Sequence, residues 1–363
     1  MTPEDLGTAE RARLDEAERG VPWRRWEPYL AERAWGTVRE DYSADGNAWA
    51  SFPHDHARSR VYRWNEDGMA GICDDRQFLC LSLALWNGVD PIMKERMFGL
   101  TGPEGNHGED AKDYWFFLDS APTHSWMRWR YLYPQGPFPY TGLVAENRRR
   151  SRLDPEYELL DTGVFDRAGG SGWWEVTVDV AKADPEDLGV AVRARNAGTA
   201  PARLHVVPTL WLRNTWSWGR DHRRATLTGD RAGSFVVMRG NSLLGDRILA
   251  AAASPRLLMC DNETNAARLW GTEGVAAVSQ GRDPRPHRPR LGNREPGSGR
   301  DQGRVLVRAR GRGRGRCRGA AAARPVGWLG PGPRCGVGAG HGGPRGRGGR
   351  LAPVPGGQGS RWA

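Results

Sequence analysis

The residues best suited to chemistry are gathered in one glycine-rich stretch, Phe98–Asp119. Glycines and a proline separate its polar side chains, which are Glu104, Asn106, His107, Glu109, Asp110 and Asp113. Glycine allows close backbone approach and positive φ. A loop that presents carboxylate, amide and imidazole groups is typical of a binding surface. Because aromatic residues follow directly, the pattern predicts a carbohydrate ligand, whose hydroxyls suit acids and amides and whose C–H faces suit aromatic rings.

The acids of this loop also have a second interpretation as a catalytic acid/base set. Asp110 and Asp113 would share a face only if this piece were helical, whereas the aromatic run that follows has the character of a strand. The alternative is that the acids cap turns or pair with arginines. For catalysis we favour this structural role, and for sugar contact the two interpretations stay open. Asn106 and His107 are the best contact candidates.

His54 and His56 form a second cluster, in the segment His54-Asp55-His56. On a strand these two rings would point the same way and could hold a metal. Zinc would need at least one further ligand, and His107 and His124 are the available suppliers. Hydrogen bonding to neighbours such as Arg58 or Asp41 is the favoured interpretation, so no metal is expected. Both histidines remain candidates for sugar contact.

Arg39, Asp41 and Trp216 complete the candidate contact residues. Arg39 and Asp41 could form a bidentate clamp for a hydroxyl, and Trp216 could line a sugar platform. Each has a structural alternative. The charged residues could form a network within the fold, and the tryptophan could cover a sheet edge.

The elements that must position these residues are mainly strands. Period-2 alternation marks residues 174–180, 188–194, 204–212, 225–228, 234–238 and 256–260. Several such runs separated by turn residues predict an antiparallel β-sandwich. A short helix is predicted from Thr2 and Pro3 to Gly20. Residues 77–86 are apolar on nearly every side, so periodicity leaves helix and strand open.

Long stretches of the chain resemble bacterial glucosidase-type proteins of glycoside hydrolase family 63. The resemblance is collinear from about Ala9 to Gly271, and it rests on motifs at 35–43, 52–64, 98–119, 122–125, 145–150, 155–165, 210–218 and 260–265. It implies an N-terminal β-sandwich followed by a large (α/α)6 barrel. It further implies inverting hydrolysis of an α-linked glucoside or oligosaccharide without a cofactor, by two carboxylates of the barrel.

The composition changes abruptly beyond about residue 273. Residues 281–363 hold 23 Gly, 19 Arg and no Lys, Phe, Tyr, Ile or Met. A segment of this composition buries too little apolar surface to offset its ordering entropy. We therefore expect three parts: a helical segment 1–34, a β-sandwich domain 35–274, and a disordered Arg/Gly/Pro-rich tail 275–363. The barrel of the family is expected to be missing.

A shifted reading frame explains the tail better than a functional nucleic-acid-binding segment does. Residues 280–288 can be encoded so that the neighbouring frame reads Lys-Asp-Gly-Ile-His-Asp-His-Ile. Residues 300–310 can likewise be encoded so that the neighbouring frame reads Gly-Thr-Lys-Ala-Ala-Phe-Trp-Tyr-Glu-Leu. Both peptides resemble what family 63 carries after its Asn-Glu-Thr-Asn segment, and both need the same shift. We place the shift near residues 272–279.

Charge and cysteine content narrow the functional class. The net charge of +10 comes from the tail, whose balance is +16, so the other 280 residues carry −6. No nucleic acid is expected to bind the folded part. Five cysteines without a CxxC motif predict reduced thiols in a cytoplasmic protein. No apolar run is long enough for a membrane span, and no signal peptide is visible.

These observations predict a truncated glycoside hydrolase of the α-glucosidase type, inactive by itself. No catalytic residue is assigned, because the carboxylates expected for catalysis belong to the barrel. The expected ligand is an oligosaccharide or glucoside, and the oligomeric state is left open. The alternatives are a non-catalytic carbohydrate-binding or scaffold module and, less favoured, an RNA-associated protein that acts through its Arg/Gly tail.

Overall fold

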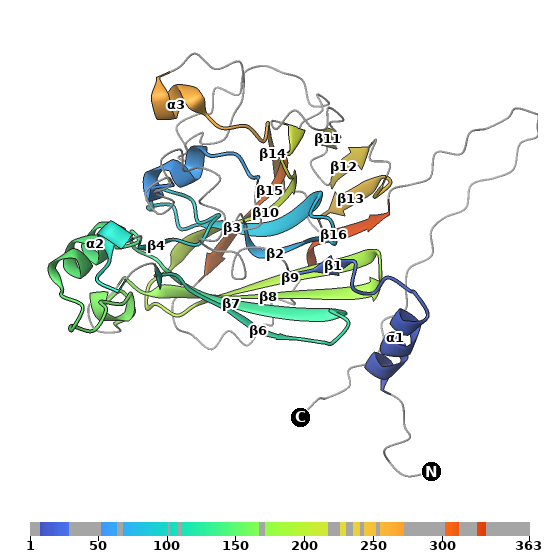
Figure 1. The fold of residues 1–363 in the computed structure, drawn as a ribbon, viewed down its shortest axis with the longest axis horizontal. Coiled ribbons are helices and arrows are strands. Elements are labelled where there is room, and N and C mark those ends of the chain that lie inside the picture. Colours follow the sequence, from blue (N-terminus) through green and yellow to red (C-terminus); the bar gives the residue numbers. More distant parts are fainter. Residues whose placement is uncertain are drawn as a thin grey trace, which may run out of the picture. The chain divides into compact units, whose positions relative to one another are not determined.

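Strands dominate the part of the chain that the structure describes. The computed structural model (Figure 1) describes residues 8–28, 52–63, 68–100, 102–107, 110–166, 171–216, 226–229, 235–239, 243–251, 255–271, 302–311 and 325–331. Its strands are antiparallel and form two large sheets and one small one. The expected mainly β, antiparallel architecture is therefore confirmed.

One sheet has the strand order β1-β2-β3-β10-β15-β14. Its strands are β1 (Trp26–Glu27), β2 (Met69–Asp74), β3 (Leu79–Trp86), β10 (Ala202–Leu212), β14 (Arg256–Cys260) and β15 (Gln302–Gly311). Every residue of β3 is buried, which explains why the sequence of this segment lacks alternation. A strand covered on both faces has no polar side. Residues 79–86, open between helix and strand in the sequence, are thus a strand.

The other large sheet has the order β11-β12-β13-β16-β9-β8-β7-β6. Its strands are β6 (Tyr114–Ser120), β7 (Trp126–Pro134), β8 (Trp173–Asp184), β9 (Asp187–Asn196), β11 (Thr226–Gly229), β12 (Phe235–Arg239), β13 (Arg247–Ala250) and β16 (Pro325–Pro331). In β8, Trp174, Val176, Val178 and Val180 are buried. The intervening residues face outward, as the period-2 pattern predicts.

The hydrophobic core lies between these two sheets, which are stacked in Figure 1. Leu81 and Leu85 of β3 and Leu210 of β10 belong to the same buried cluster as Trp129 of β7 and Val178 of β8. Large aromatic side chains are fully enclosed, with Trp129 and Tyr131 both 0% exposed. The predicted sandwich is therefore formed by the two inner faces.

Short helices and a two-stranded sheet are inserted between the strands. They are α1 (Ala9–Glu18), the 3-10 helix η5 (His54–Ser59), β4 (Gly99–Leu100), the 3-10 helix η6 (Gly102–Glu104), β5 (Asp110–Ala111), α2 (Tyr140–Arg149), the 3-10 helix η7 (Leu160–Thr162) and α3 (Ala266–Trp270). Among the described helices, none is long and apolar enough to cross a membrane.

Helix α1 differs from the prediction at its start. Its N-cap is Thr8, whose hydroxyl accepts a hydrogen bond from the Arg11 amide at 3.1 Å. The expected cap Thr2 lies outside the described residues. The helix ends before Gly20, as predicted, where φ is +93°. Glu10 then joins the helix to the turn between β6 and β7, because its carboxylate accepts from the Thr123 amide at 2.8 Å and the Ser125 hydroxyl at 2.8 Å.

Two segments of the expected tail are strands. β15 pairs with β10 on one side and β14 on the other, and β16 pairs with β13 and β9. The structure differs here from a tail that is disordered throughout. Each segment carries a local apolar run, Val305–Val307 and Trp328–Leu329, which is enough for a strand when two partner strands offer backbone hydrogen bonds on both sides. The remainder of residues 275–363 lies outside the described residues.

A buried amide at Asn262 fastens the chain after β14 to the rest of the sandwich. Its Nδ2 donates to the carbonyl oxygens of Tyr62 at 2.7 Å and Leu212 at 2.8 Å. Its Oδ1 accepts from the Tyr62 amide at 2.7 Å. Asn262 is 0% exposed, so water cannot replace these partners. One side chain thereby joins three segments that are far apart in sequence.

Replacement of Asn262 by alanine should therefore destabilise the fold strongly. The change removes the side-chain partner of the Tyr62 amide and of the Leu212 carbonyl oxygen, whereas the Tyr62 carbonyl oxygen still accepts from the Asn214 amide at 3.1 Å. Each buried group that loses its partner costs about 1–3 kcal/mol, so we expect a loss of at least about 2 kcal/mol in the free energy of unfolding, measured by urea denaturation. Asn265→Ala is the matched control, because Asn265 caps the N-terminus of α3 and a lost cap costs about 1 kcal/mol. Equal losses in the two variants would contradict the role assigned to Asn262.

Candidate functional site

The glycine-rich stretch folds around the ammonium group of Lys112, which follows β5. This lysine side chain is 1% exposed and lies among three carboxylates. Its Nζ donates to Glu156 at 3.1 Å and Glu158 at 2.9 Å, and it forms an ion pair with Asp110. Burial alone would lower the pKa of Lys112, but hydrogen bonds with Asp110 and Glu158 outweigh burial and raise the pKa to about 12. Lys112 is therefore a fixed positive charge.

The three acids around Lys112 have the spacing of metal ligands. One oxygen from each of Asp110, Glu156 and Glu158 lies within 4.8 Å of the others. Hard cations prefer such oxygen sets. In this fold, however, the lysine ammonium contacts all three carboxylates and supplies the positive charge. Burial raises the pKa of Asp110; Lys112 opposes this shift, and Glu156 adds to it.

A second buried lysine, Lys94, pairs with Asp113. Its Nζ lies 3.2 Å from Asp113 Oδ1, and the two side chains are 1% and 0% exposed. Asp113 also accepts from the Tyr131 hydroxyl at 2.6 Å and from the Phe98 amide at 2.6 Å. The Lys94 ammonium lies over the rings of Phe98 and Phe138, at 4.1 and 3.3 Å from the ring centres. Burial lowers the pKa of Lys94, whereas Asp113 and Asp90 raise it.

Asn106, His107 and Glu104 hold the loop to neighbouring segments. Asn106 is buried, and its Nδ2 donates to the carbonyl oxygens of Ser151 at 2.9 Å and Asp154 at 3.1 Å. The His107 ring makes a 2.7 Å contact through Nε2 with the same Asp154 carbonyl oxygen. Glu104 accepts from the Tyr140 hydroxyl at 3.0 Å. The two best contact candidates are thus brought together, but Asn106 Nδ2 and His107 Nε2 both contact backbone carbonyl oxygens.

His54 and His56 lie on η5 rather than on a strand, so the geometry considered for a metal pair does not arise. The His54 ring stacks on Tyr140, with ring centres 3.8 Å apart. His56 Nδ1 lies 3.4 Å from a guanidinium nitrogen of Arg60, in line with the favoured interpretation as a hydrogen-bonding residue. The cavity beside His54 measures about 20 Å³, enough for about one water molecule and too small for a sugar.

The remaining sequence candidates fall elsewhere. Trp216 is partly buried, and its indole N–H donates to Glu263 Oε1 at 2.8 Å. Asn214 donates to the other oxygen of the same carboxylate at 3.2 Å. Trp216 therefore belongs to the network that fastens the Asn262 segment. Arg39, Asp41 and Glu109 lie outside the described residues.

Sequence reasoning missed the lysines and two of the acids that organise this site. Lys94 and Lys112 belong to no recognisable motif, and a lysine in a polar loop is normally expected to be exposed to solvent. Glu156 and Glu158 are more than 40 residues from Lys112 in sequence. The available signal was their alternate spacing in Pro155-Glu-Tyr-Glu158, which places both carboxylates on one side of an extended segment.

The arrangement favours structure over acid/base chemistry. Inverting hydrolysis needs two carboxylates roughly 6.5–9.5 Å apart with a water between them. The acids around Lys112 are closer than that, and a buried ammonium occupies the space between them. Asp113 is enclosed. The sequence favoured a structural role for these acids over a catalytic one. Their contacts agree with the structural role.

Breaking the Lys94–Asp113 pair should be costly. Asp113→Ala removes the carboxylate that contacts the buried Lys94 ammonium and leaves only the charge of Asp90 nearby, and the loss of one partner of a buried pair costs about 3–5 kcal/mol. We expect urea denaturation to show a decrease of this size in the free energy of unfolding. The double variant Lys94→Met/Asp113→Asn removes both charges, so it should lose less than the sum of its two single substitutions. Strictly additive losses would contradict the coupling.

His54 should make the fold sensitive to mild acid. Burial and the charges of Lys94 and Arg58 lower the pKa of His54 from 6.5 to about 3. The unfolded chain then binds a proton below pH 6.5 that the folded chain does not accept until about pH 3. Stability from this group is complete above pH 6.5 and is lost as the pH falls toward 3.

The variant His54→Phe tests this effect because it keeps an aromatic ring on Tyr140 and removes the titration. The unfolding free energy of the wild type minus that of the variant should fall by up to about 1.4 kcal/mol per pH unit below pH 6. Between pH 7.5 and 8.5 the same difference should stay constant, which provides the control. A difference that is constant from pH 7.5 down to 4.5 would contradict the assignment.

Comparison with known proteins gives one informative relative. No protein-family model matches the chain. The chain is 38% identical over 281 residues to a protein of Saccharomyces cerevisiae described as "Uncharacterized protein YMR196W". The match covers 69% of this chain and 26% of the yeast protein. This chain therefore spans about a quarter of the length of that relative, and most of the yeast protein lies outside the shared region.

Proposed function

We propose that this chain is the β-sandwich part of a glycoside hydrolase of the α-glucosidase type and does not hydrolyse glucosides by itself. One observation carries the proposal. Two acids of the glycine-rich stretch form ion pairs with buried lysines: Asp110 with Lys112 and Asp113 with Lys94. A carboxylate tied to a buried ammonium is a poor proton donor, and it is equally poorly placed to activate a water.

Two further findings support this proposal. The sandwich architecture is the one that the resemblance to family 63 implies for an N-terminal domain. The yeast relative is about four times as long as the matched region, which leaves room in such proteins for a separate catalytic domain. The substrate in the complete protein is an α-linked glucoside or a glucose-bearing oligosaccharide, cleaved with inversion by carboxylates outside the sandwich.

We place the protein in the cytoplasm. The support comes from the sequence, whose five cysteines are odd in number and include no CxxC motif, a pattern typical of reduced thiols in a reducing compartment.

The decisive experiment restores the reading frame. Sequencing of the gene through codons 265–300 should reveal a one-base correction near codons 272–279 that extends the resemblance. The corrected protein should then release glucose from α-linked glucose disaccharides and leave the β-linked cellobiose intact. The 363-residue chain should release none, because among the described residues Asp110 and Asp113 are held in ion pairs with Lys112 and Lys94.

Two outcomes would overturn the proposal. Release of glucose by the purified 363-residue chain would show that the sandwich or its tail carries catalysis. A gene without any in-frame extension, or a corrected protein inactive on every α-linked disaccharide, would remove the hydrolase assignment. Glucose is measured with a coupled oxidase assay, and a thermal unfolding curve verifies that each protein is folded.

A further inference from the structure

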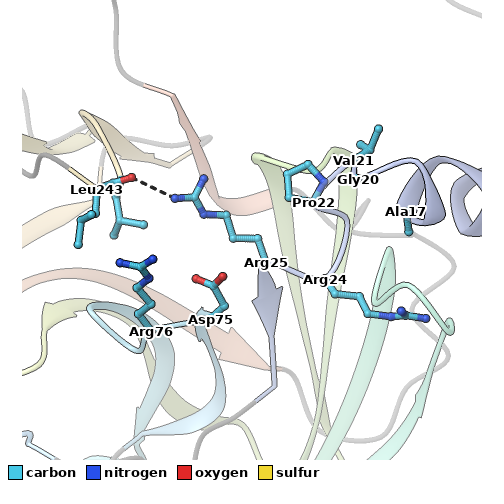
Figure 2. Close-up of a pocket in the computed structure, with 10 residues that line it drawn as sticks. Ala17, Gly20, Val21, Pro22, Arg24, Arg25, Asp75, Arg76 and Leu243 are labelled. Carbon is cyan, nitrogen blue, oxygen red and sulfur yellow. Dashed lines mark hydrogen bonds between the residues drawn. The ribbon is translucent and has the colours of Figure 1, made fainter.

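A cavity of about 540 Å³ is lined by none of the residues of the glycine-rich stretch (Figure 2). It forms where the residues after α1 meet the turn between β2 and β3 and the segment before β13. Pockets for small molecules typically measure about 300–1,000 Å³, so this one can accept a ligand of the size of a monosaccharide derivative.

The cavity is positively charged. Arg24, Arg25 and Arg76 line it together with a single acid, Asp75, giving a formal charge of +2. Guanidinium groups present several donors in a plane and match the oxygens of phosphate. Apolar side chains, among them Val21 and Leu243, complete the wall. The lining therefore offers anion contacts and apolar contacts side by side.

Arg25 is held in a fixed position. Its Nη1 donates to Glu186 Oε1 at 2.8 Å and its Nη2 donates to the Leu243 carbonyl oxygen at 3.1 Å, the contact drawn in Figure 2. Glu186 does not neutralise Arg25 fully, because it also pairs with Arg247. A preorganised guanidinium loses little side-chain entropy when it binds an anion.

Arg76 is placed to share that anion. Its backbone amide donates to Asp74 Oδ1 at 3.0 Å, which fixes the turn that carries it. Within the described part of the chain, its guanidinium makes no hydrogen bond or ion pair. Figure 2 shows Arg25 and Arg76 extending toward Leu243, with the Asp75 carboxylate between their stems. Two cations and one hydroxyl acceptor therefore converge on the same space.

We propose that this cavity binds a phosphorylated sugar, with the phosphoryl group on Arg25 and Arg76 and a sugar hydroxyl on Asp75. Charge-assisted bonds between arginine and phosphate supply the main attraction. Asp75 repels a bare anion and accepts a hydroxyl, so it favours a sugar phosphate over free phosphate. The sugar half of this inference rests on the proposed function, whereas the phosphoryl half rests on the arginines alone.

Isothermal titration calorimetry on the full chain at low salt tests the proposal with inorganic phosphate, glucose 6-phosphate and glucose. Glucose 6-phosphate should bind most tightly, inorganic phosphate more weakly, and glucose undetectably. Arg76→Gln should lower the affinity for inorganic phosphate and for glucose 6-phosphate at least about tenfold, equivalent to about 1.4 kcal/mol. Arg152→Gln makes the same change of charge at an exposed loop residue and should leave both affinities unchanged.

Asp75→Asn separates a specific site from a merely basic surface. Without the carboxylate, inorganic phosphate should bind more tightly and the preference for glucose 6-phosphate should shrink. Arg76 and Asp75 are both exposed turn residues, so the variants should keep the thermal midpoint of the wild type. Binding is read without any hydrolysis, which keeps this test separate from the glucose-release experiment.

Three results would contradict the inference. Failure of the wild type to bind either phosphate would remove the site. If Arg76→Gln and Arg152→Gln lowered the phosphate affinity equally, the loss would be due to net charge alone. Equal affinity for inorganic phosphate and glucose 6-phosphate would overturn the sugar half.

Discussion

The end of the sandwich that carries the glycine-rich stretch depends on a single buried carboxylate, that of Asp113. It accepts hydrogen bonds from the Tyr131 hydroxyl on β7 and from the Phe98 amide at the start of the stretch, and it lies 3.2 Å from the Lys94 ammonium. A charge removed from water persists only when its partners satisfy nearly all of its lone pairs. The Asp113 carboxylate therefore links the start of the glycine-rich stretch, strand β7 and Lys94 to one another.

This requirement gives Asp113 a structural role in the fold. A buried carboxylate that stays ionised needs a compensating cation, and Lys94 lies 3.2 Å from Asp113. Lys112 and Lys94 form ion pairs with Asp110 and Asp113, so these two acids serve as counter-ions. Catalytic carboxylates need one partner with a raised pKa and one with open access to water. Asp113 has no open access to water, because its side chain is 0% exposed.

Much of the sandwich could be predicted from the sequence because period-2 alternation depends on burial of one face. The pattern in residues 174–180 specifies both the strand β8 and its inner face. The site could not be predicted to the same degree. Its geometry depends on pairs such as Lys112 with Glu156, which are far apart in sequence and carry no local pattern. His54 illustrates the same limit, since its partner Tyr140 lies 86 residues further along the chain.

The position of β15 connects the fold to the reading-frame hypothesis. This strand lies between β10 and β14 and pairs with both. Interior strands are usually rich in β-branched and aromatic residues, yet residues 302–311 contain three arginines and two glycines. These positions can be encoded so that the neighbouring frame would read Ala-Ala-Phe-Trp-Tyr-Glu-Leu, a peptide richer in aromatic residues. The reading-frame hypothesis therefore predicts a different composition for this interior strand, and the coding DNA tests it.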